Sequence, residues 1–268
     1  MSDSKSVVQS AAKTFAVLRA FTFDNAELTI SEVAERSALD RGTAFRLINT
    51  LVALGYLAVV SGTRKFRLTL KCLDLGYSAL ALGGLRSMAA PALRDMVPDL
   101  ADAASLGVLD GPDVVYVARI QVDMGRRDLD RRVGSRTGAY AAALGHVLLA
   151  WMPPDEAGAV LVKGDRIRLS ERTLVDMDAL MDRLSAVRAQ GYATADGENV
   201  YGLRTIAMPV LDAMGQVRAG ISLTIRNERQ ELDTFVARAL PVLAQKTAEL
   251  SAALQKIELG VEPARRRA

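Results

Sequence analysis

Residues 39–56 constrain this chain more than any other segment, because they carry the signals of one bounded amphipathic helix. Asp40 can accept hydrogen bonds from the free amides of a helix start, and Gly55 supplies a left-handed end. Three leucines recur at helical spacing and are expected in a core, namely Leu47, Leu51 and Leu54. The opposite side then carries a polar cluster near the N-terminal end, formed by Arg41, Thr43, Arg46 and Thr50. This layout suits a helix that enters a DNA major groove by its tip, although two arginines are also typical of a solvated face.

The segments on either side favour the DNA-binding interpretation. Residues 29–32, Thr-Ile-Ser-Glu, have the spacing of a capping box and predict the start of a short helix. Residues 37–39 form a brief turn between the two helices. Residues 56–60 read as a strand, residues 61–63 as a turn, and residues 64–68 alternate polar with apolar side chains. Two helices, a tight turn and a basic hairpin predict a winged helix-turn-helix.

These segments, with residues 10–21 and 28–34, resemble the DNA-binding domain of the IclR family of bacterial transcriptional regulators. The first helix is expected over residues 8–21, with its apolar side chains in the core: Val8, Ala11, Phe15 and Leu18. The resemblance and the pattern together give a set of candidate DNA contacts: Lys13, Arg19, Arg41, Thr43, Arg46, Thr50, Arg64, Lys65 and Arg67. Lys13 and Arg19 can approach phosphates, or can simply be solvated.

Composition bounds the remaining possibilities. A length of 268 residues suits two domains, and a net charge of +3 permits nucleic-acid binding without demanding it. The single cysteine, Cys72, excludes an internal disulfide and fits a reducing compartment, with a buried thiol favoured over a redox sensor. We find no apolar run of about 18 residues and no signal-peptide pattern. The expectation is a soluble cytoplasmic protein that makes no use of a membrane.

The expected organisation has four parts. Residues 1–69 form the winged helix-turn-helix domain, residues 70–84 a linker helix, residues 85–258 an effector domain, and residues 259–268 a basic tail. The linker helix carries apolar side chains that its own small domain would leave exposed to solvent. They are Leu70, Leu73, Leu75, Tyr77, Leu80 and Leu82. A second copy of the chain would cover them, which predicts a homodimer reading a two-fold DNA site.

The second domain is predicted to be an α+β sheet covered by helices. Two hairpins are expected, at residues 106–120 and 205–225. Helices are expected at residues 85–104, 139–151, 155–162, 176–190 and 228–257, the last interrupted by Pro241.

This domain resembles the GAF-like effector domain of the IclR family, which binds a small metabolite. Residues 133–136, 141–150, 188–192 and 202–210 carry the resemblance, and 133–136 with 202–207 are closest to the branch that controls aromatic-acid catabolism. The resemblance implies a pocket between the sheet and the loop entering the helix at Ala143, with a small carboxylic acid as effector. The chain departs from the family pattern at Thr137-Gly138, often Leu-Pro, at Ala142, often Ser or Thr, and at Gly197, which splits an acidic pair.

The resemblance places ten residues at this pocket: Arg119, Tyr140, Ala143, Leu144, Asp196, Glu198, Leu203, Thr205, Ser222 and Thr224. The amides of Ala143 and Leu144 would face the carboxylate at the positive end of a helix. Tyr140 would stack on the ligand or pack in the core. Arg119, Arg136 or Arg204 could add a forked partner for the carboxylate, and the sequence leaves that choice open.

Two rival classes are weaker. A small-molecule-transforming enzyme with an accessory DNA-binding domain would need a catalytic constellation, yet His146 is the only histidine, without a nucleophile elbow or metal-ligand spacing around it. An architectural DNA-coating protein would not need the large apolar second domain. We therefore expect no catalytic residue, metal or cofactor, and a dimer or tetramer on double-stranded DNA whose recognition helices move apart or together with the effector. Activation or repression, the operator and the effector stay open.

Overall fold

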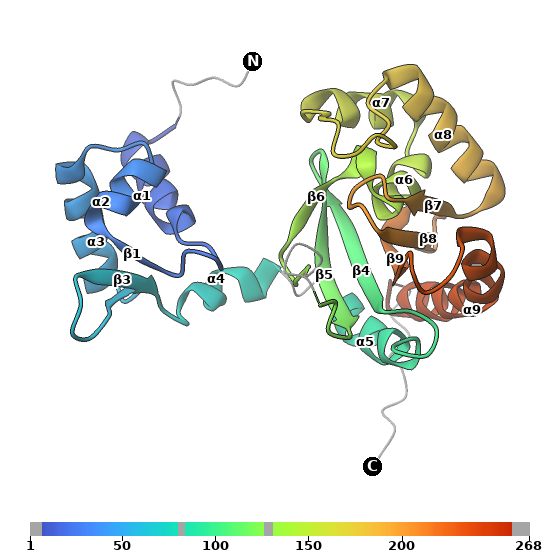
Figure 1. The fold of residues 1–268 in the computed structure, drawn as a ribbon, viewed down its shortest axis with the longest axis horizontal. Helices are drawn as coiled ribbons and strands as arrows, with labels where there is room; N and C mark the ends of the chain where they lie inside the picture. The colour runs from blue at the N-terminus through green and yellow to red at the C-terminus, as the bar shows by residue number, and fades with distance from the viewer. Residues whose placement is uncertain (1–6, 80–83, 126–130, 259–268) are drawn as a thin grey trace, which may run out of the picture. The chain divides into compact units, whose positions relative to one another are not determined.

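The computed structural model describes residues 7–79, 84–125 and 131–258. The chain divides into two compact units, Met1–Ala81 and Leu82–Ala268 (Figure 1). Within the described ranges no helix combines the length and apolar character needed to cross a membrane. The expected basic tail at 259–268 and the expected end of the linker helix, with Leu80 and Leu82, lie outside the described residues.

The N-terminal unit packs helices against a small antiparallel sheet with strand order β1-β3-β2. Its elements are α1 (Gln9–Ala20), β1 (Glu27–Thr29), α2 (Ile30–Arg36), α3 (Arg41–Ala53), β2 (Leu57–Val59), β3 (Lys65–Leu68) and α4 (Cys72–Ala79). The hairpin β2–β3 is the predicted wing. Strand β1 was not predicted, and it pairs with β3 along its whole length.

The helix boundaries of this unit follow the sequence signals. Thr29 and Glu32 form a reciprocal capping box at the start of α2, and the Asp40 side chain accepts from the Thr43 amide at the start of α3. Hydrogen bonding by the Thr43 side chain and by the Thr43 backbone lowers the pKa of the Asp40 carboxyl. Gly55 follows α3 with φ +79°, as a left-handed helix end requires. The expected recognition helix is therefore present with its predicted limits.

Two core predictions are wrong in this unit. On α3 the buried side chains are Ala44, Ile48 and Leu51, whereas Leu54 is 53 % exposed because it lies at the C-cap, beyond the last helical turn that faces the core. On α1 the core takes Val17 and Ala20. The residues expected inside, Val8, Ala11 and Phe15, are exposed and Leu18 is partly buried, because α1 turns the other side of its helix toward α2 and α3.

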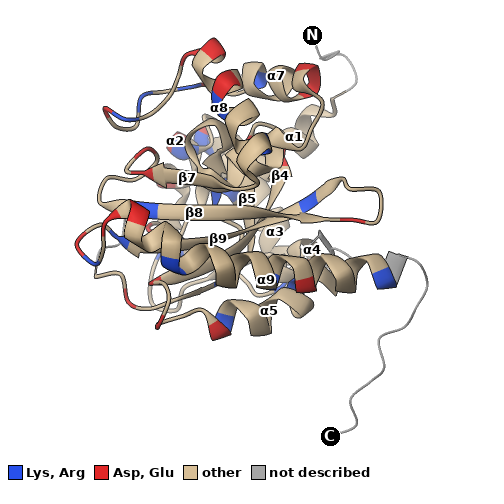
Figure 2. Ribbon diagram, turned by 90° about the vertical axis from the view of Figure 1, so that its right-hand side faces the viewer, with Lys and Arg blue, Asp and Glu red and all other residues tan. Residues whose placement is uncertain are grey.

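The C-terminal unit is an antiparallel six-stranded sheet with strand order β6-β5-β4-β9-β8-β7. Its strands are β4 (Ala103–Asp110), β5 (Asp113–Gln121), β6 (Arg136–Gly138), β7 (Ala193–Asp196), β8 (Leu203–Leu211) and β9 (Val217–Arg226). Its helices are α5 (Leu85–Asp95), the 3-10 turn η4 (Ala139–Ala141), α6 (Ala143–Ala150), α7 (Pro154–Lys163), α8 (Met177–Gln190) and α9 (Leu232–Glu258). Figure 2 shows α5 and α9 on one side of the sheet and α7 and α8 on the other.

Both predicted hairpins are present, as β4–β5 and β8–β9. The helix expected over 85–104 is shorter: α5 ends at Asp95, and Ala103 already belongs to β4. The predicted interruption at Pro241 is also wrong, since α9 continues through this residue. Two short edge strands, β6 and β7, were not predicted because three or four residues give too little alternation to recognise.

Candidate DNA-binding surface and effector pocket

The recognition helix α3 presents its polar residues to solvent. Arg41, Arg46 and Thr50 are exposed, and Thr43 is partly exposed. Arg46 Nη2 lies 3.5 Å from Thr43 Oγ1, while Thr50 Oγ1 donates to the Arg46 carbonyl at 2.9 Å. Because Ala44 and Ile48 anchor the opposite side in the core, this polar side stays accessible along the helix.

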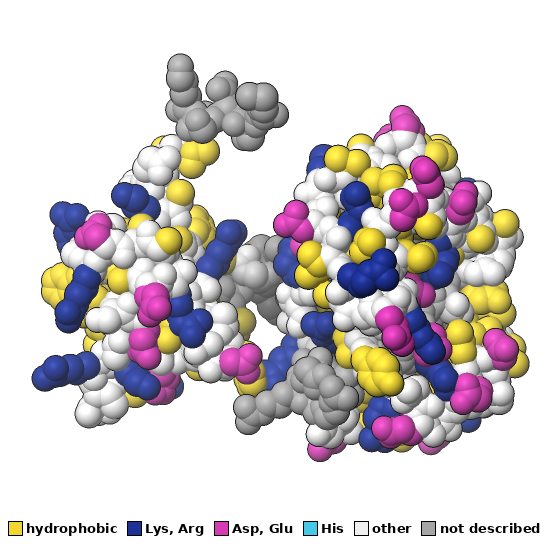
Figure 3. Space-filling model, turned by 45° about the horizontal axis from the view of Figure 1, so that its top comes forward, with side chains coloured by type: hydrophobic (Ala, Val, Ile, Leu, Met, Phe, Trp, Pro, Cys, Tyr) yellow, Lys and Arg dark blue, Asp and Glu magenta, His cyan; other side chains and the backbone are white. Residues whose placement is uncertain are grey.

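Further basic side chains surround α3. The remaining predicted contacts are all exposed: Lys13 and Arg19 on α1, Arg64 in the turn of the wing, and Lys65 and Arg67 on β3. None of these cations, nor Arg41 or Arg46, forms an ion pair with an acid of the described residues. Lys and Arg side chains project from this unit in the space-filling view (Figure 3). Unpaired, exposed cations are free to neutralise phosphates.

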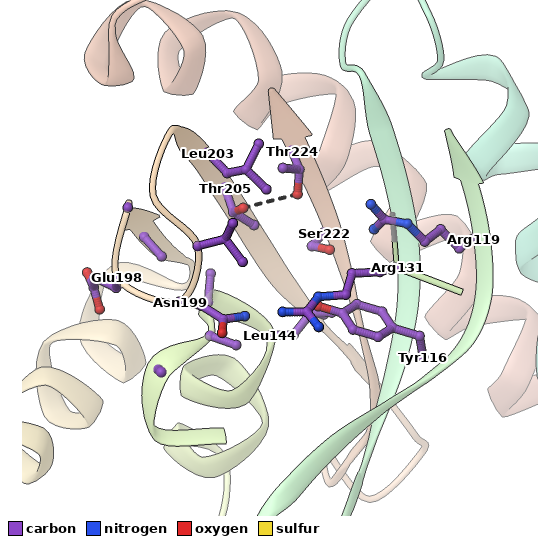
Figure 4. Close-up of a pocket in the computed structure, with 16 residues that line it drawn as sticks. Tyr116, Arg119, Arg131, Leu144, Glu198, Asn199, Leu203, Thr205, Ser222 and Thr224 are labelled. Atoms are coloured by element: carbon purple, nitrogen blue, oxygen red, sulfur yellow. Dashed lines mark hydrogen bonds between the residues drawn. The ribbon is translucent and has the colours of Figure 1, made fainter. Parts of the chain in front are cut away.

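The C-terminal unit contains a cavity between the sheet and the start of α6 (Figure 4). Its floor and walls come from three strands: Tyr116 and Arg119 on β5, Leu203 and Thr205 on β8, and Ser222 and Thr224 on β9. The loop after β7 contributes residues 197–200, and the helical entry contributes residues 141–144. Arg131 and Ala195 complete the lining.

Glycines allow α6 to approach the sheet closely. A Cβ on Gly145 would lie 2.0 Å from the Ala139 carbonyl oxygen, so η4 and α6 can meet only without a side chain here. The Leu144 side chain packs over Gly107 and Gly220, which face each other on β4 and β9. Cβ atoms on these two glycines would lie within 3.0 Å of Leu144 methyl groups. These contacts place the first turn of α6 at the cavity.

The cavity presents several hydrogen-bonding groups. Thr205 Oγ1 and Thr224 Oγ1 are 3.0 Å apart and bond to each other. Ser222 is 2 % exposed, and its hydroxyl forms no hydrogen bond with a described residue. The amides of Ala143 and Leu144 belong to a first helical turn that no side chain caps, because Ala142 stands at the N-cap. These groups can bind a polar ligand.

Three of the arginines that could bind a carboxylate are held by other groups. Arg119 donates to the Ser105 and Gln121 side chains. Arg136 pairs with Asp110 and Asp113 at the open edge of the sheet, away from the cavity. Arg204 pairs with Asp196 and Glu231 and also lies outside the lining. The sequence leaves the choice among these three open, and it does not point to Arg131, which lines the cavity.

Tyr140 and Asp196 lie outside this cavity, in contrast to the prediction. The Tyr140 hydroxyl donates to the Ile167 carbonyl at 2.8 Å, so this ring packs rather than stacking on a ligand. Asp196 forms ion pairs with Arg172 and Arg204 on the outer side of the loop.

Glu198 does line the cavity, but its carboxylate turns away from the centre (Figure 4). Its Oε1 pairs with Arg183 of α8 at 3.1 Å, while the buried Oε2 finds no partner among the described residues. Burial raises the pKa of this carboxyl, against the opposing effect of Arg183.

His146 is fully buried in α6 and does not line the cavity. Its Nε2 lies 2.7 Å from the Tyr140 carbonyl oxygen, which requires the Nε2–H form, and Nδ1 has no partner among the described residues. Burial lowers the pKa of His146 to about 4. The described residues hold no group of three metal-ligating side chains. His146 is thus a core residue that fastens α6 to η4.

Sequence reasoning missed Tyr116, Arg131 and Asn199 at the cavity. Tyr116 and Arg119 share one face of β5 because Val117 is an extra residue: Tyr116 pairs with Gly107, and Ala118 with Leu106. Strict alternation along the strand would have separated them. Arg131 and Asn199 lie outside regular strands and helices, where no periodic signal exists.

Comparison with known proteins agrees with this architecture. Residues 10–61 match the model of the IclR helix-turn-helix domain, and residues 78–252 match that of the bacterial transcriptional regulator IclR C-terminal domain. The HTH-type transcriptional regulator KdgR of Escherichia coli is 35 % identical, covering 86 % of this chain and 88 % of that protein. The Pca regulon regulatory protein of Pseudomonas putida is 34 % identical, covering 90 % of this chain and 82 % of that protein.

Solved structures show the same fold. A transcriptional regulator from Rhodococcus sp. RHA1 superposes with a TM-score of 0.81 at 37 % identity, covering 94 % of this chain and all of that one. An IclR homologue from Microbacterium hydrocarbonoxydans, complexed with 4-hydroxybenzoate, superposes with a TM-score of 0.78 at 25 % identity. The match covers 92 % of this chain and 99 % of that one.

A winged helix-turn-helix joined to a ligand-binding α/β domain defines a DNA-binding transcriptional regulator. The chain belongs to the IclR family, whose members regulate transcription and are not enzymes. The predicted α+β fold class is confirmed. DNA and a small-molecule effector are accordingly the two partners of this family member.

Proposed function

We propose that this chain acts as a homodimer whose binding to a two-fold operator responds to a small carboxylic acid, with aromatic acids foremost. The observation that carries this proposal is the cavity itself. It combines the uncapped amides of Ala143 and Leu144 with Arg119 and Arg131, and the carboxylate of Glu198 is turned away. An electropositive site favours an anionic ligand.

One of the related structures supports an aromatic acid. The Microbacterium homologue is complexed with 4-hydroxybenzoate. KdgR is 35 % identical and its name specifies no aromatic ligand, so short aliphatic acids belong in any test beside the aromatic ones. Leu144, Leu203 and Val200 give the cavity apolar walls against which a flat ring can lie.

DNA binding is proposed for residues 1–69, with α3 in the major groove and the wing against the DNA sugar-phosphate backbone. Residues 70–84 are the proposed linker. Arg41, Thr43, Arg46 and Thr50 would reach base edges or nearby phosphates. Lys13, Arg19, Arg64, Lys65 and Arg67 would contact phosphates, which sets orientation and salt dependence. Residues 85–258 would bind the effector.

The proposed homodimer is supported by apolar side chains that the chain leaves in solvent. On and beside α4, Leu70, Leu73 and Leu75 are 81 %, 63 % and 54 % exposed. On and beside α1, Val8 and Phe15 are 65 % and 53 % exposed. Burying such residues stabilises association by roughly 25 cal/mol per Å² of apolar surface. Leu73→Glu should yield monomers in light scattering, and a dimeric variant would contradict this interface.

The test of function is a gel shift on the DNA upstream of the chain's own gene. The shift is repeated with 4-hydroxybenzoate, protocatechuate, pyruvate and gluconate. Retardation that one of these acids changes supports the proposal. Absence of retardation at low ionic strength, with every acid present and absent, refutes it.

Site variants separate effector binding from folding. Thr205→Ala and Ser222→Ala should weaken the response to the active acid and leave effector-free DNA binding near wild type, because both residues face the cavity in the other unit. Loss of DNA binding itself would assign them to folding instead.

A further inference from the structure

Arg131 differs from the other arginines near the cavity. It lines the cavity, and it forms neither an ion pair nor a hydrogen bond with any residue that the structure describes. Figure 4 shows its guanidinium pointing into the cavity, toward the Asn199 amide and beside the Tyr116 hydroxyl. Arg119 also lines the cavity, but its guanidinium donates to Ser105 and Gln121.

Two buried hydroxyls face the same space. Ser222 is 2 % exposed and Tyr116 is 7 % exposed, and neither hydroxyl forms a hydrogen bond within the described part of the chain. Burial raises the pKa of Tyr116, so its phenol stays protonated at neutral pH and can donate. Hydroxyls that converge on one cavity and have no partner among the described residues are available to bond a ligand there.

The guanidinium of Arg131 favours an acceptor with negative charge. A guanidinium offers only donors, and a carboxylate offers two oxygens with about four acceptor sites. Among the charged side chains lining the cavity, Glu198 alone is acidic, and it pairs with Arg183 outside the cavity. Nothing described in the lining therefore competes with a ligand anion for Arg131.

We infer that Arg131 is the residue that binds the effector carboxylate, together with the Tyr116 and Ser222 hydroxyls, and that Arg119 acts as a positioning residue. This inference rests on the proposed function and names the recognition group within it. Arg119 lies 5.6 Å from the centre of the Tyr116 ring and is held by Ser105 and Gln121. Its Nε and Nη1 donors are thus taken by Gln121 and Ser105, and its contact with the ring keeps Tyr116 in place.

The test measures binding by calorimetry with the full-length chain. The probes are the four acids named above and the uncharged amide of each acid. In the wild type, the acid that binds should bind more tightly than its amide. Arg131→Gln should weaken binding of that acid roughly 10- to 100-fold, as expected for loss of a hydrogen bond between charged groups. The variant should also lose the preference for the acid over its amide. Tyr116→Phe should weaken it several-fold.

Two control variants make the result specific. Arg132→Gln changes the neighbouring, exposed arginine, which does not line the cavity, and should bind acids as the wild type does. Arg119→Gln should weaken the binding of acid and amide equally and keep the preference for the acid, since Arg119 acts only through Tyr116. Circular dichroism and effector-free DNA binding report whether each variant is folded.

The outcomes are distinguishable. Arg131→Gln binding the acid with wild-type affinity, or keeping the preference over the amide, overturns the inference and leaves the proposed function intact. An equal loss in Arg132→Gln also overturns it, because the effect would then be general electrostatics. If the wild type binds none of the acids, the proposed function fails and this inference fails with it.

Discussion

Gly145 is the position where a single methyl group should do most damage to the effector unit. It lies in the first turns of α6, and a Cβ there would be 2.0 Å from the Ala139 carbonyl oxygen and 2.4 Å from the Ala139 Cα. Favourable contacts between heavy atoms need roughly 3.5 Å, so η4 and α6 would have to separate by about 1.5 Å. The obstacle is backbone, and no rotamer change can relieve it.

The expected cost follows from this geometry. Overpacking a core costs typically about 1–3 kcal/mol, and Gly145→Ala should reach the upper end because α6 packs against the strands β8 and β9 as well as α8. For a unit of this size, roughly 3 kcal/mol corresponds to a fall of about 6–12 °C in Tm. Acid binding should weaken too, since the first turn of α6 would be displaced from the cavity.

The matched control is Gly158→Ala, on α7. Gly158 has no heavy atom within 4 Å of the position of an added Cβ, so only helix propensity changes. Alanine should then stabilise the unit by up to about 1 kcal/mol, a rise of roughly 2–4 °C. Differential scanning calorimetry of both variants provides the comparison. A Gly145→Ala protein that melts within 2 °C of the wild type would refute the close-approach argument.

Three further predictions concern the DNA-binding unit and pH. Arg46→Ala should weaken operator binding by about 1–3 kcal/mol and relax specificity at one base pair; equal losses on all sequences in gel shifts would rule out a base contact. Lys65→Ala should weaken binding to every DNA and reduce the salt slope by about one, and an unchanged slope would separate the wing from the phosphates. Because His146 has its pKa lowered to about 4 when folded, the unfolded chain takes up its proton first as pH falls through 6.5. The free energy of unfolding should therefore drop by about 3 kcal/mol between pH 6.5 and 4, and His146→Gln should flatten this dependence in urea titrations; an equally steep curve for the variant would exclude His146 as the cause.

Much of the N-terminal unit could be predicted because its signals are local. The capping box at Thr29, the N-cap at Asp40 and the left-handed Gly55 each act within four residues, and all three are present as expected. The wrong side of α1 was assigned to the core because Val8, Ala11 and Phe15 satisfy helical spacing equally well. Periodicity finds an apolar face but does not tell whether the same chain or a second one covers it.

The cavity was less predictable for a different reason. The resemblance placed residues such as Thr205 and Ser222 at the lining, and the structure brings them together there. Tyr116 depends on the bulge at Val117, which is a property of the pairing between two strands and not of one strand alone. Arg131 and Asn199 depend on the path of loops, which no local pattern determines.

The loop that follows β7 and lines the cavity, residues 197–202, is held by contacts with residues that do not line the cavity. It runs between two left-handed glycines, Gly197 and Gly202. The Glu198 carbonyl accepts from Thr173 Oγ1 at 2.6 Å, and the Glu198 carboxylate holds Arg183 of α8. A ligand that displaced Asn199 would therefore strain the contacts of Glu198 with Thr173 and Arg183 first. The displacement would reach α8 before it reached α5 and α9, which lie on the other side of the sheet.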